Sequence, residues 1–334
     1  MVTLKDIAAA CGVSASTVSR ALNGVETIKP DRANMIRAAA QHMGYTPNAV
    51  ARALKTNRSW MIGVLYEGRI THPYFSLLID AIRSSAEEEG FDLIFLSRSQ
   101  QNGGMDYPNH ALCRHMDGVV ILYANVDADG VQRLLNGSIP VVSVDDCDRD
   151  CDVVMSDYRL GTRALVRSAV EKGHRRIAFV HGQMGYMTRQ RLIGFREEMA
   201  ANGLAVPEDF VRAAEFVNGE RSAEAVRRLL ALPHPPTCVL LPDDLSLLSA
   251  MRILRSEGIR VPQDVSCIGY DGIPLGQAAS PRLTTYQQDV QALGEAVIQT
   301  ILNAINDGAA HQTAARLIRG RLIPGETLGN PPII

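Results

Sequence analysis

The sequence predicts a small all-α domain at the N-terminus, followed by a two-lobed α/β body. In the first 46 residues, apolar side chains recur at helical spacing in three short stretches. From Met61 onward, short apolar strands alternate with helical stretches, a pattern typical of parallel sheets covered by helices. Because about nine strands are too many for one doubly wound sheet, the body is expected to have two lobes.

The three N-terminal helices have recognisable ends. Thr3 and Ser14 can each cap a helix through a side-chain oxygen. Gly12 can end the first helix with a positive φ, and Gly44 can close the third. The helices are expected over Leu4–Cys11, about Ala15–Leu22 (ended by Asn23 and Gly24), and Pro30 to about Met43. The first two helices with a glycine-containing turn between them form a helix-turn-helix.

The second of these helices consists mostly of residues with small side chains. Val13, Val18 and Leu22 form one narrow apolar stripe that is expected to face the domain core. In a helix-turn-helix the second helix enters the DNA major groove, so small outer residues let its backbone approach the duplex. A solvated helix without a partner is the alternative interpretation. The residues expected at the DNA are Thr3, Ser14, Ala15, Ser16, Thr17, Ser19, Arg20 and Asn23.

Different chemistry is expected of these positions. Thr17, Ser19 and the helix N-terminal amides suit phosphate groups. Arg20 is long enough for a bidentate contact to guanine, whereas Ser16 can bond to several bases and Ala15 can touch a thymine methyl group. Arg20 is therefore the one side chain here with strong base-discriminating chemistry.

A short linker helix is expected after this domain. Pro47 ends the globule, and Asn48 can cap a helix over residues 49–54. So short a helix with little apolar surface is marginal in isolation and needs a partner to form.

The body contributes a long series of strands. Many end in polar residues, and ligands of such folds bind at the carboxyl ends of strands, which predicts a cleft between the lobes. Strands are expected at residues 61–66, 91–97, 117–123, 139–145, 175–182, 237–244 and 264–271, with helices near 74–89 and 107–116.

The charge is unevenly distributed along the chain. Residues 1–60 carry eight basic and three acidic side chains, a net charge of +5, whereas the whole chain of 334 residues has a net charge of −2. A basic N-terminal module on an acidic body indicates a polyanionic partner for the module alone.

Composition excludes several classes of protein. The apolar content of 46% is ordinary for globular proteins, no apolar run reaches the roughly 18 residues of a membrane span, and no signal peptide is recognisable. Six scattered cysteines do not form a disulfide framework, which indicates a reducing cytoplasm. Cys147 and Cys151 lie close together, but no second pair follows at zinc spacing. We expect no metal, no cofactor and no membrane contact.

Two contiguous segments identify a family. VTLKDIAAACGVSASTVSRALNG followed by YTPNAVARAL resembles the DNA-binding domain of the LacI/GalR family of bacterial transcription regulators. IGVLY, DGVVIL, KGHRRIAFVHG, RQRLIGFREEM and VPQDVSCIGYDGIP continue the resemblance in family order, over nearly the whole chain. The body is similar to periplasmic sugar-binding proteins.

This resemblance implies a homodimer bound to a near-palindromic operator. It also implies that residues 48–54 form a hinge helix on DNA, with Leu54 wedged into the central base step from the minor groove. Arg52 and Lys55 lie beside it for phosphates or groove edges, and Asn48 and Ala51 belong to the same surface. A core role in a linker helix is the alternative for Leu54. The absence of C-terminal leucine heptads favours a dimer over a tetramer.

The implied domains follow the family pattern. They are a helix-turn-helix domain (1–46), a hinge and linker (47–60), a first effector lobe (61–159 plus about 289–316), and a second effector lobe (160–288 plus about 317–334).

The resemblance also implies an effector site between the lobes. Arg191 in RQRLIGF and Asp271 in IGYDG match the pair that holds sugar hydroxyls or a ribose, and a guanidinium and a carboxylate suit vicinal hydroxyls. Asp145 matches a further polar position. Tyr74 and Phe75 match positions that line the cleft from the first lobe, where an aromatic face can stack on a ring.

Two further effector positions are less closely matched. Phe216 is expected to stack from the second lobe. Asp243 stands where many sugar-responsive members have asparagine, so it accepts hydrogen bonds without donating. Each could instead have an ordinary structural role. Gly185 and Met187 stand where the purine-responsive type has arginine and threonine, which argues against purines.

Together these observations predict a cytoplasmic, nucleoid-associated regulator. We expect a ligand-responsive repressor of carbohydrate-use genes, with operator DNA, a sugar or sugar derivative and a second copy of the chain as its partners. The alternatives are a regulator that responds to a nucleoside or another small molecule, and a solute-binding protein. An enzyme is not expected, because G-x-S-x-G, a glycine-rich phosphate loop and H-E-x-x-H are all missing from the sequence.

The wedge leads to a direct test. Leu54→Ala should weaken specific operator binding, because less apolar surface is left to unstack the central base step. Fluorescence anisotropy with operator DNA measures the loss, and thermal unfolding should be unchanged. A parallel loss of thermal stability would instead identify Leu54 as a core residue.

Overall fold

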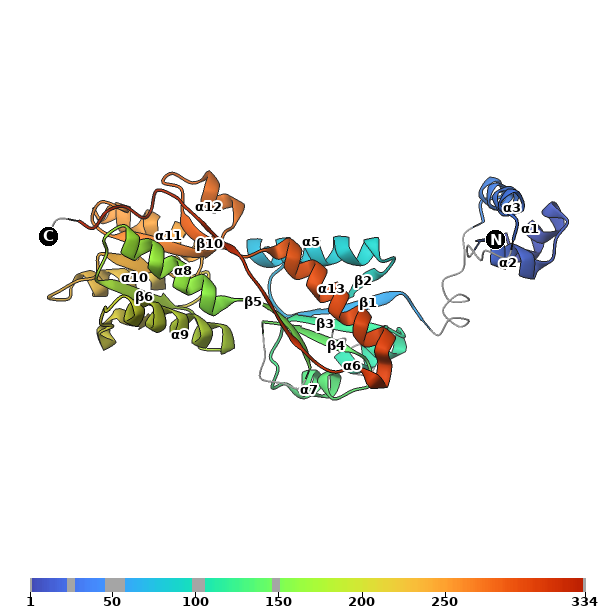
Figure 1. Ribbon diagram of the computed structural model, residues 1–334, viewed down its shortest axis with the longest axis horizontal. Helices are drawn as coiled ribbons and strands as arrows, with labels where there is room; N and C mark the ends of the chain where they lie inside the picture. The colour runs from blue at the N-terminus through green and yellow to red at the C-terminus, as the bar shows by residue number, and fades with distance from the viewer. Residues whose placement is uncertain (1, 23–27, 46–57, 98–105, 146–150, 333–334) are drawn as a thin grey trace. The chain divides into compact units, whose positions relative to one another are not determined.

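The computed structural model describes residues 2–22, 28–45, 58–97, 106–145 and 151–332. The chain divides into two compact units, residues 1–59 and residues 60–334. Each unit is described here by itself (Figure 1). Among the described helices, none is long and apolar enough to cross a membrane.

The first unit is a three-helix domain of α1 (Leu4–Cys11), α2 (Ala15–Leu22) and α3 (Pro30–His42). Their ends agree with the predicted ones within a residue. Thr3 and Asp6 form a reciprocal capping box at α1, and Gly12 ends it with φ 62°. The Ser14 hydroxyl accepts the Thr17 N–H at 3.1 Å, which caps α2.

The core of this unit is small and made of short side chains. Ile7, Val18 and Ile36, one from each helix, have no exposed surface, and Ala21 is equally buried. Val13 and Leu22 are only partly buried against this core. The predicted stripe therefore has its centre at Val18 and includes Ala21, which the sequence pattern did not single out.

The first lobe of the second unit is built on a six-stranded parallel sheet of order β11-β5-β4-β3-β1-β2. Helices α5 and α13 lie side by side on one face (Figure 1), and α6 and α7 cover the other. The strands are β1 (Met61–Tyr66), β2 (Asp92–Phe95), β3 (Gly118–Tyr123), β4 (Val141–Val144), β5 (Asp152–Ser156) and β11 (Ala315–Ile318). The helices are α5 (Pro73–Glu88), α6 (Tyr107–Cys113), α7 (Asp129–Leu135) and α13 (Val290–Asp307).

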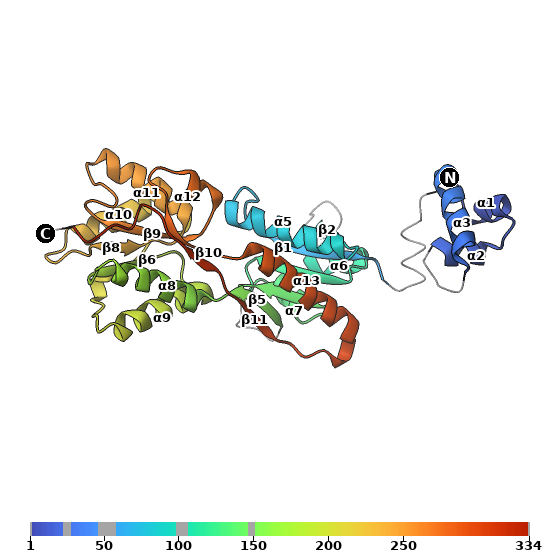
Figure 2. The ribbon, with the colours of Figure 1, turned by 45° about the horizontal axis from the view of Figure 1, so that its top comes forward.

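The second lobe repeats this plan with the order β12-β10-β9-β8-β6-β7, in which only the β10–β12 pair is antiparallel. Helices α8 and α9 lie together on one side, and α10 and α11 on the other (Figure 2). The strands are β6 (Ile177–His181), β7 (Val211–Ala213), β8 (Cys238–Leu240), β9 (Ser266–Asp271), β10 (Thr284–Gln287) and β12 (Arg321–Ile323). The helices are α8 (Tyr158–Glu171), α9 (Tyr186–Ala201), α10 (Gly219–Leu230), α11 (Asp244–Ser256) and α12 (Pro274–Ala278), and the short 3-10 turns are Glu208–Phe210 and Gly308–Ala310.

The chain passes between the two lobes three times: from β5 to α8, from β10 to α13, and from β11 to β12. An apolar contact adds to these connections. Ile273, which follows β9, is 1% exposed and belongs to the hydrophobic cluster of the first lobe, against which Leu245 and Leu248 of α11 also pack. The lobes therefore share part of one core.

Helices α8 and α9 approach each other closely at a glycine. A Cβ atom on Gly194 would lie 2.4 Å from the backbone oxygen of Arg159. Next to this contact, the buried carboxylate of Glu198 accepts from Arg163 and Arg167 at 2.9 and 3.0 Å. These hydrogen bonds lower the pKa of Glu198, so the carboxylate stays charged between the two helices.

The close contact between α8 and α9 at Gly194 predicts that a methyl group added at this position destabilises the protein. Gly194→Ala should destabilise the protein by about 1–3 kcal/mol, because α8 and α9 must move apart. Alanine favours the helix over glycine by about 1 kcal/mol, so a loss of stability isolates the steric clash. Urea unfolding measures the change.

Gly185→Ala at the start of α9 is the matched control. A Cβ there meets nothing within 4 Å. Its effect should be at most about 1 kcal/mol, the scale of a weak N-cap change. Equal stability of Gly194→Ala and the native protein would contradict the prediction.

Candidate functional site

The outer surface of α2 carries the residues predicted to meet DNA. Ser16 and Arg20 are exposed, while Ala15, Thr17 and Ser19 are partly buried. The Arg20 Nε donates to the Ser16 backbone oxygen at 3.4 Å, so the side chain lies along the helix. The Ser14 hydroxyl is within 2.8 Å of the Ser16 and Thr17 hydroxyls. Thr3 is engaged in its capping box.

The remaining predicted DNA contacts lie outside the described residues. These are Asn23 and the hinge residues Asn48, Ala51, Arg52, Leu54 and Lys55. Their roles stay predictions.

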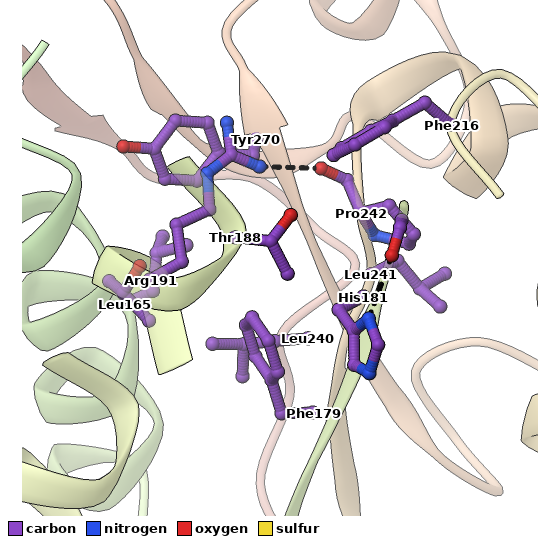
Figure 3. A pocket seen from close by; sticks show the side chains of 12 residues that line it. Leu165, Phe179, His181, Thr188, Arg191, Phe216, Leu240, Leu241, Pro242 and Tyr270 are labelled. Carbon is purple, nitrogen blue, oxygen red and sulfur yellow. Dashed lines mark hydrogen bonds between the residues drawn. The ribbon is translucent and has the colours of Figure 1, made fainter. Parts of the chain in front are cut away.

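The second unit holds a buried guanidinium between its lobes. Arg191 on α9 is 4% exposed, and its Nη1 donates to the Pro242 backbone oxygen at 2.8 Å. The guanidinium carbon lies 3.5 Å from the centre of the Tyr270 ring, and Figure 3 shows the group stacked on that ring. A ring face and a carbonyl oxygen both stabilise a desolvated cation. The geometry fixes the position of this charge.

Two carboxylates face this cation. Asp271, the last residue of β9, lies 3.9 Å from the Arg191 Nη2 and accepts from the Gln288 Nε2 at 2.8 Å. Burial raises the pKa of Asp271 well above its usual range, although Arg191 works in the opposite direction. Asp145, just after β4 in the other lobe, has its pKa raised by burial to about 6. Both residues have positive φ, 104° and 69°.

Positive φ is uncommon outside glycine and is strained when the residue lies far from the left-handed helical region, as Asp271 does. Hydrogen bonds hold both backbones in place: Asp145 N–H donates to Val154, and the Asp271 carbonyl accepts from Gln288. Such strain is typical of functional sites, because only a well-determined environment maintains it.

Tyr74 reaches this charged centre from the first lobe. It is 5% exposed, and burial together with the nearby charges of Asp145 and Asp271 raises the pKa of its hydroxyl. Several buried polar atoms at this place have no hydrogen-bond partner among the described residues. They are the Tyr74 and Tyr270 hydroxyls, the Arg191 Nε, Asp145 Oδ1 and Gln288 Oε1. Because unpartnered buried polar atoms are costly, the site is suited to a ligand rich in hydroxyl groups.

Phe216 lies at the edge of the same site. Its ring packs against Gly182, where a Cβ would lie 2.3 Å from the ring, so the approach needs glycine. Together with Thr188 and Arg191 it lines a small cavity above the β6 and β8 strand ends (Figure 3).

Asp243 has a structural role that accounts for its burial. As the N-cap of α11 it accepts from the Ser246 N–H and hydroxyl, both at 2.7 Å, and from the Val217 N–H at 2.8 Å. Its predicted contact with an effector stays a prediction, although capping already engages both carboxylate oxygens.

The neighbouring Asp244 was missed in the sequence. It has no exposed surface, and its Oδ2 accepts from the Ile273 N–H at 2.9 Å. Burial raises the pKa of Asp244 to about 7. Asp244 therefore holds the backbone of the residue that packs into the first lobe. Its only signal in the sequence was the pair of adjacent aspartates after a buried strand.

The two tyrosines beside Arg191 were not predictable from motifs. The rings of Tyr158 and Tyr270 both lie beside Arg191, with their centres 5.2 and 3.5 Å from the guanidinium carbon. Among the described residues, no group of three or more His, Cys, Asp or Glu side chains could hold a metal ion. Cys147 lies outside the described part.

Comparison with known proteins agrees with this architecture. Residues 3–48 match the model of the bacterial regulatory proteins of the lacI family, and residues 166–328 match a periplasmic binding protein-like domain. The ribose operon repressor of Escherichia coli K12 is 30% identical over 323 residues, which cover 95% of this chain and 97% of the repressor. The chain belongs to the LacI family.

Two solved structures of transcription regulators resemble it over almost their whole length. The lac repressor dimer bound to operator and the anti-inducer ONPF is 27% identical, with a TM-score of 0.79 and coverage of 98% of this chain and 99% of that one. The complex of the transcriptional regulator CelR with cellobiose is 26% identical, with a TM-score of 0.69 and coverage of 98% and 100%.

As a LacI-family member, the protein is a DNA-binding transcriptional repressor and not an enzyme. Its helix-turn-helix and its two-lobed effector body correspond to the predicted fold class.

The raised pKa of Asp244 predicts how stability depends on pH. The folded carboxyl keeps its proton to about pH 7, whereas the unfolded one loses it near pH 4. The folded state therefore binds more protons in this window, and the contribution of Asp244 to stability falls as the pH rises. Asp244→Asn should therefore gain stability relative to the native protein as the pH rises from 5 to 8, by on the order of 1 kcal/mol or more.

Urea unfolding at pH 5 to 8 measures the difference between the two proteins. Asp92→Asn, which changes an exposed carboxyl at the start of β2, is the control and should follow the native protein throughout. A difference between Asp244→Asn and the native protein that does not change with pH would contradict the prediction.

Proposed function

We propose that this protein is a homodimeric, cytoplasmic repressor of carbohydrate-use genes. Its affinity for a near-palindromic operator changes when a sugar or sugar derivative binds between the lobes of the second unit. The first unit reads DNA through α2, with Arg20 as the main base-discriminating side chain and Ala15 and Ser16 as weaker ones. Because one short helix reads few base pairs, two-fold symmetry is needed for useful specificity.

Charge supports the DNA half of the proposal. The +5 net charge of residues 1–60 attracts a polyanion, and the exposed α2 surface is made of small side chains that allow close approach. Thr17, Ser19 and the α2 N-terminal amides are assigned to phosphates. Asn48, Ala51, Arg52, Leu54 and Lys55 are assigned to the minor groove and its phosphates.

One observation carries the effector half: buried polar atoms without partners come from both lobes and surround Arg191. The Asp145 Oδ1 and the Tyr74 hydroxyl belong to the first lobe, and the Arg191 Nε and the Tyr270 hydroxyl belong to the second. A ligand that supplies hydroxyl groups to all four satisfies these atoms and links the lobes. Acidic groups outnumber the single guanidinium, which favours neutral polyols over phosphates and acids.

The position of the effector site between the lobes accounts for its coupling to DNA binding. A ligand that binds both lobes favours one relative orientation of them, and only a difference in affinity for the two orientations shifts the equilibrium. Three chain crossings and the buried Ile273 limit this motion to a rearrangement of two preformed bodies. We assign the output to residues 48–54, which are expected to form a hinge helix too short to be stable alone.

Selection from randomised duplexes at physiological salt tests the proposal. The enriched sequence should be a near-palindrome bound at least about a thousandfold more tightly than random duplex. A thermal-shift screen of pentoses, hexoses, glycosides and sugar acids then identifies the effector. A protein that binds every duplex equally, or that no sugar stabilises while a nucleoside does, would overturn the corresponding half of the proposal.

Arg191→Ala separates the two halves. It should weaken effector binding at least about a hundredfold and abolish the response, because the charge-assisted hydrogen bonds of the site are lost, while operator affinity without effector stays within about threefold. Arg196→Ala, an exposed arginine on the same helix, is the matched control. An unchanged effector response in Arg191→Ala would remove this residue from the site.

A further inference from the structure

Three aromatic rings gather at the carboxyl edge of the first-lobe sheet. Tyr66 ends β1, Tyr123 ends the neighbouring β3, and Phe75 lies in the first turn of α5. The ring centres of Tyr66 and Phe75 are 5.2 Å apart, those of Phe75 and Tyr123 are 5.9 Å apart, and those of Tyr66 and Tyr123 are 6.3 Å apart. We call these three residues the aromatic platform.

The platform is not a core cluster. Tyr123 is 58% exposed, and Tyr66 and Phe75 are partly buried. By contrast, the second-lobe tyrosines Tyr158 and Tyr270 are each 2% exposed. Three contacting aromatic rings with this much accessible surface are an unusual feature of a monomer surface and mark a place where another molecule can bind.

Hydrogen bonds fix the platform before any ligand arrives. The Tyr66 hydroxyl donates to the Arg69 backbone oxygen at 2.9 Å. The Glu67 N–H donates to the Tyr123 carbonyl, and the Glu67 carboxylate accepts from the Tyr107 hydroxyl and the Asn125 N–H, all at 2.8 Å. The segments after β1 and β3 are thereby joined, so little conformational entropy is lost when a ring stacks there.

The platform is continuous with the polar site around Arg191. Phe75 lies 5.2 Å from the ring of Tyr74, whose buried hydroxyl faces Asp145, Asp271 and Arg191. It is also 5.2 Å from the ring of His72. A single side chain, Tyr74, therefore separates the acceptor-rich site from the aromatic surface.

The chemistry of the platform selects an uncharged occupant. The platform contains no carboxylate and no cationic side chain, and burial together with the neighbouring Tyr123 raises the pKa of Tyr66 to about 12. An aromatic face binds the C–H face of a sugar ring or another aromatic ring, and the Arg191 site binds hydroxyl groups.

We propose that the effector has two linked rings: a hydroxylated sugar ring held at Arg191, Asp271 and Asp145, and a second, uncharged ring stacked on Tyr66, Phe75 and Tyr123. This inference rests on the proposed sugar-responsive function and names the class of effector, a disaccharide or an aryl glycoside. A monosaccharide fills only the polar half.

Matched glycosides test the proposal by isothermal titration calorimetry on the full chain. The methyl and phenyl β-glycosides of glucose, galactose, xylose and ribose are compared, together with cellobiose and lactose. For the sugar that binds, the two-ring compound should bind about tenfold or more tightly than the methyl glycoside. If only the phenyl glycosides bind more tightly than the methyl glycosides, the effector is an aryl glycoside. If only the disaccharides do so, the effector is a disaccharide.

Tyr123→Ala should reduce the ratio of the affinity for the two-ring compound to that for the methyl glycoside to about threefold or less. The affinity for the methyl glycoside itself should stay within about twofold of the native value. Because Tyr123 is exposed, the fold should tolerate the change, and thermal unfolding checks this. Leu112→Ala, which removes another exposed apolar side chain of the same lobe (51% exposed), is the control and should leave the ratio unchanged.

The outcomes separate this inference from the proposed function. Equal affinities for methyl and two-ring glycosides would overturn the two-ring effector while a sugar effector stands. Failure of every glycoside would overturn both. If Tyr123→Ala changes the oligomeric state in light scattering and leaves the affinity ratio intact, the platform is a contact between chains and the inference is wrong.

Discussion

The buried guanidinium of Arg191 is the constraint on which the second unit depends. A cation that is 4% exposed must be satisfied by fixed partners, because water cannot reach it. Its partners come from two places in the sequence: the backbone oxygen of Pro242 after β8, and the adjacent Tyr270 ring and Asp271 carboxylate at the end of β9. The close contact of Gly194 with α8, one helical turn further along α9, holds the helix that carries this charge.

The burial of Arg191 beside two carboxyl groups also determines which ligands the site can bind. Asp145 and Asp271 are buried carboxyls with raised pKa values, and a donor that reaches them favours their charged form. Hydroxyl groups supply such donors without adding charge. The surrounding tyrosines supply ring faces for the apolar parts of a ligand. Different residues therefore contact the polar and the apolar parts, and each set can be substituted without changing the other.

Local signals explain how far the sequence could predict this molecule. Thr3, Gly12 and Ser14 fix helix ends within a few residues of themselves, and apolar runs such as residues 61–66 define buried strands, so the fold class was accessible. Arg191 and Asp271 were found through motif resemblance, and the structure brings them within 3.9 Å, while their contact with an effector stays a prediction. Tyr66 and Tyr123 are 57 positions apart and meet only through the β1–β3 register, which no local pattern contains.

The three crossings between the lobes have a consequence for biosynthesis. The helical core of residues 1–59 is complete once α3 has been made, whereas the first lobe lacks α13 and β11 until residue 318 has been added. Throughout most of translation, the face of this sheet that α13 covers stays open. Chains truncated after β10 would thus carry a finished helix-turn-helix on an unfinished first lobe, whose open apolar face favours aggregation.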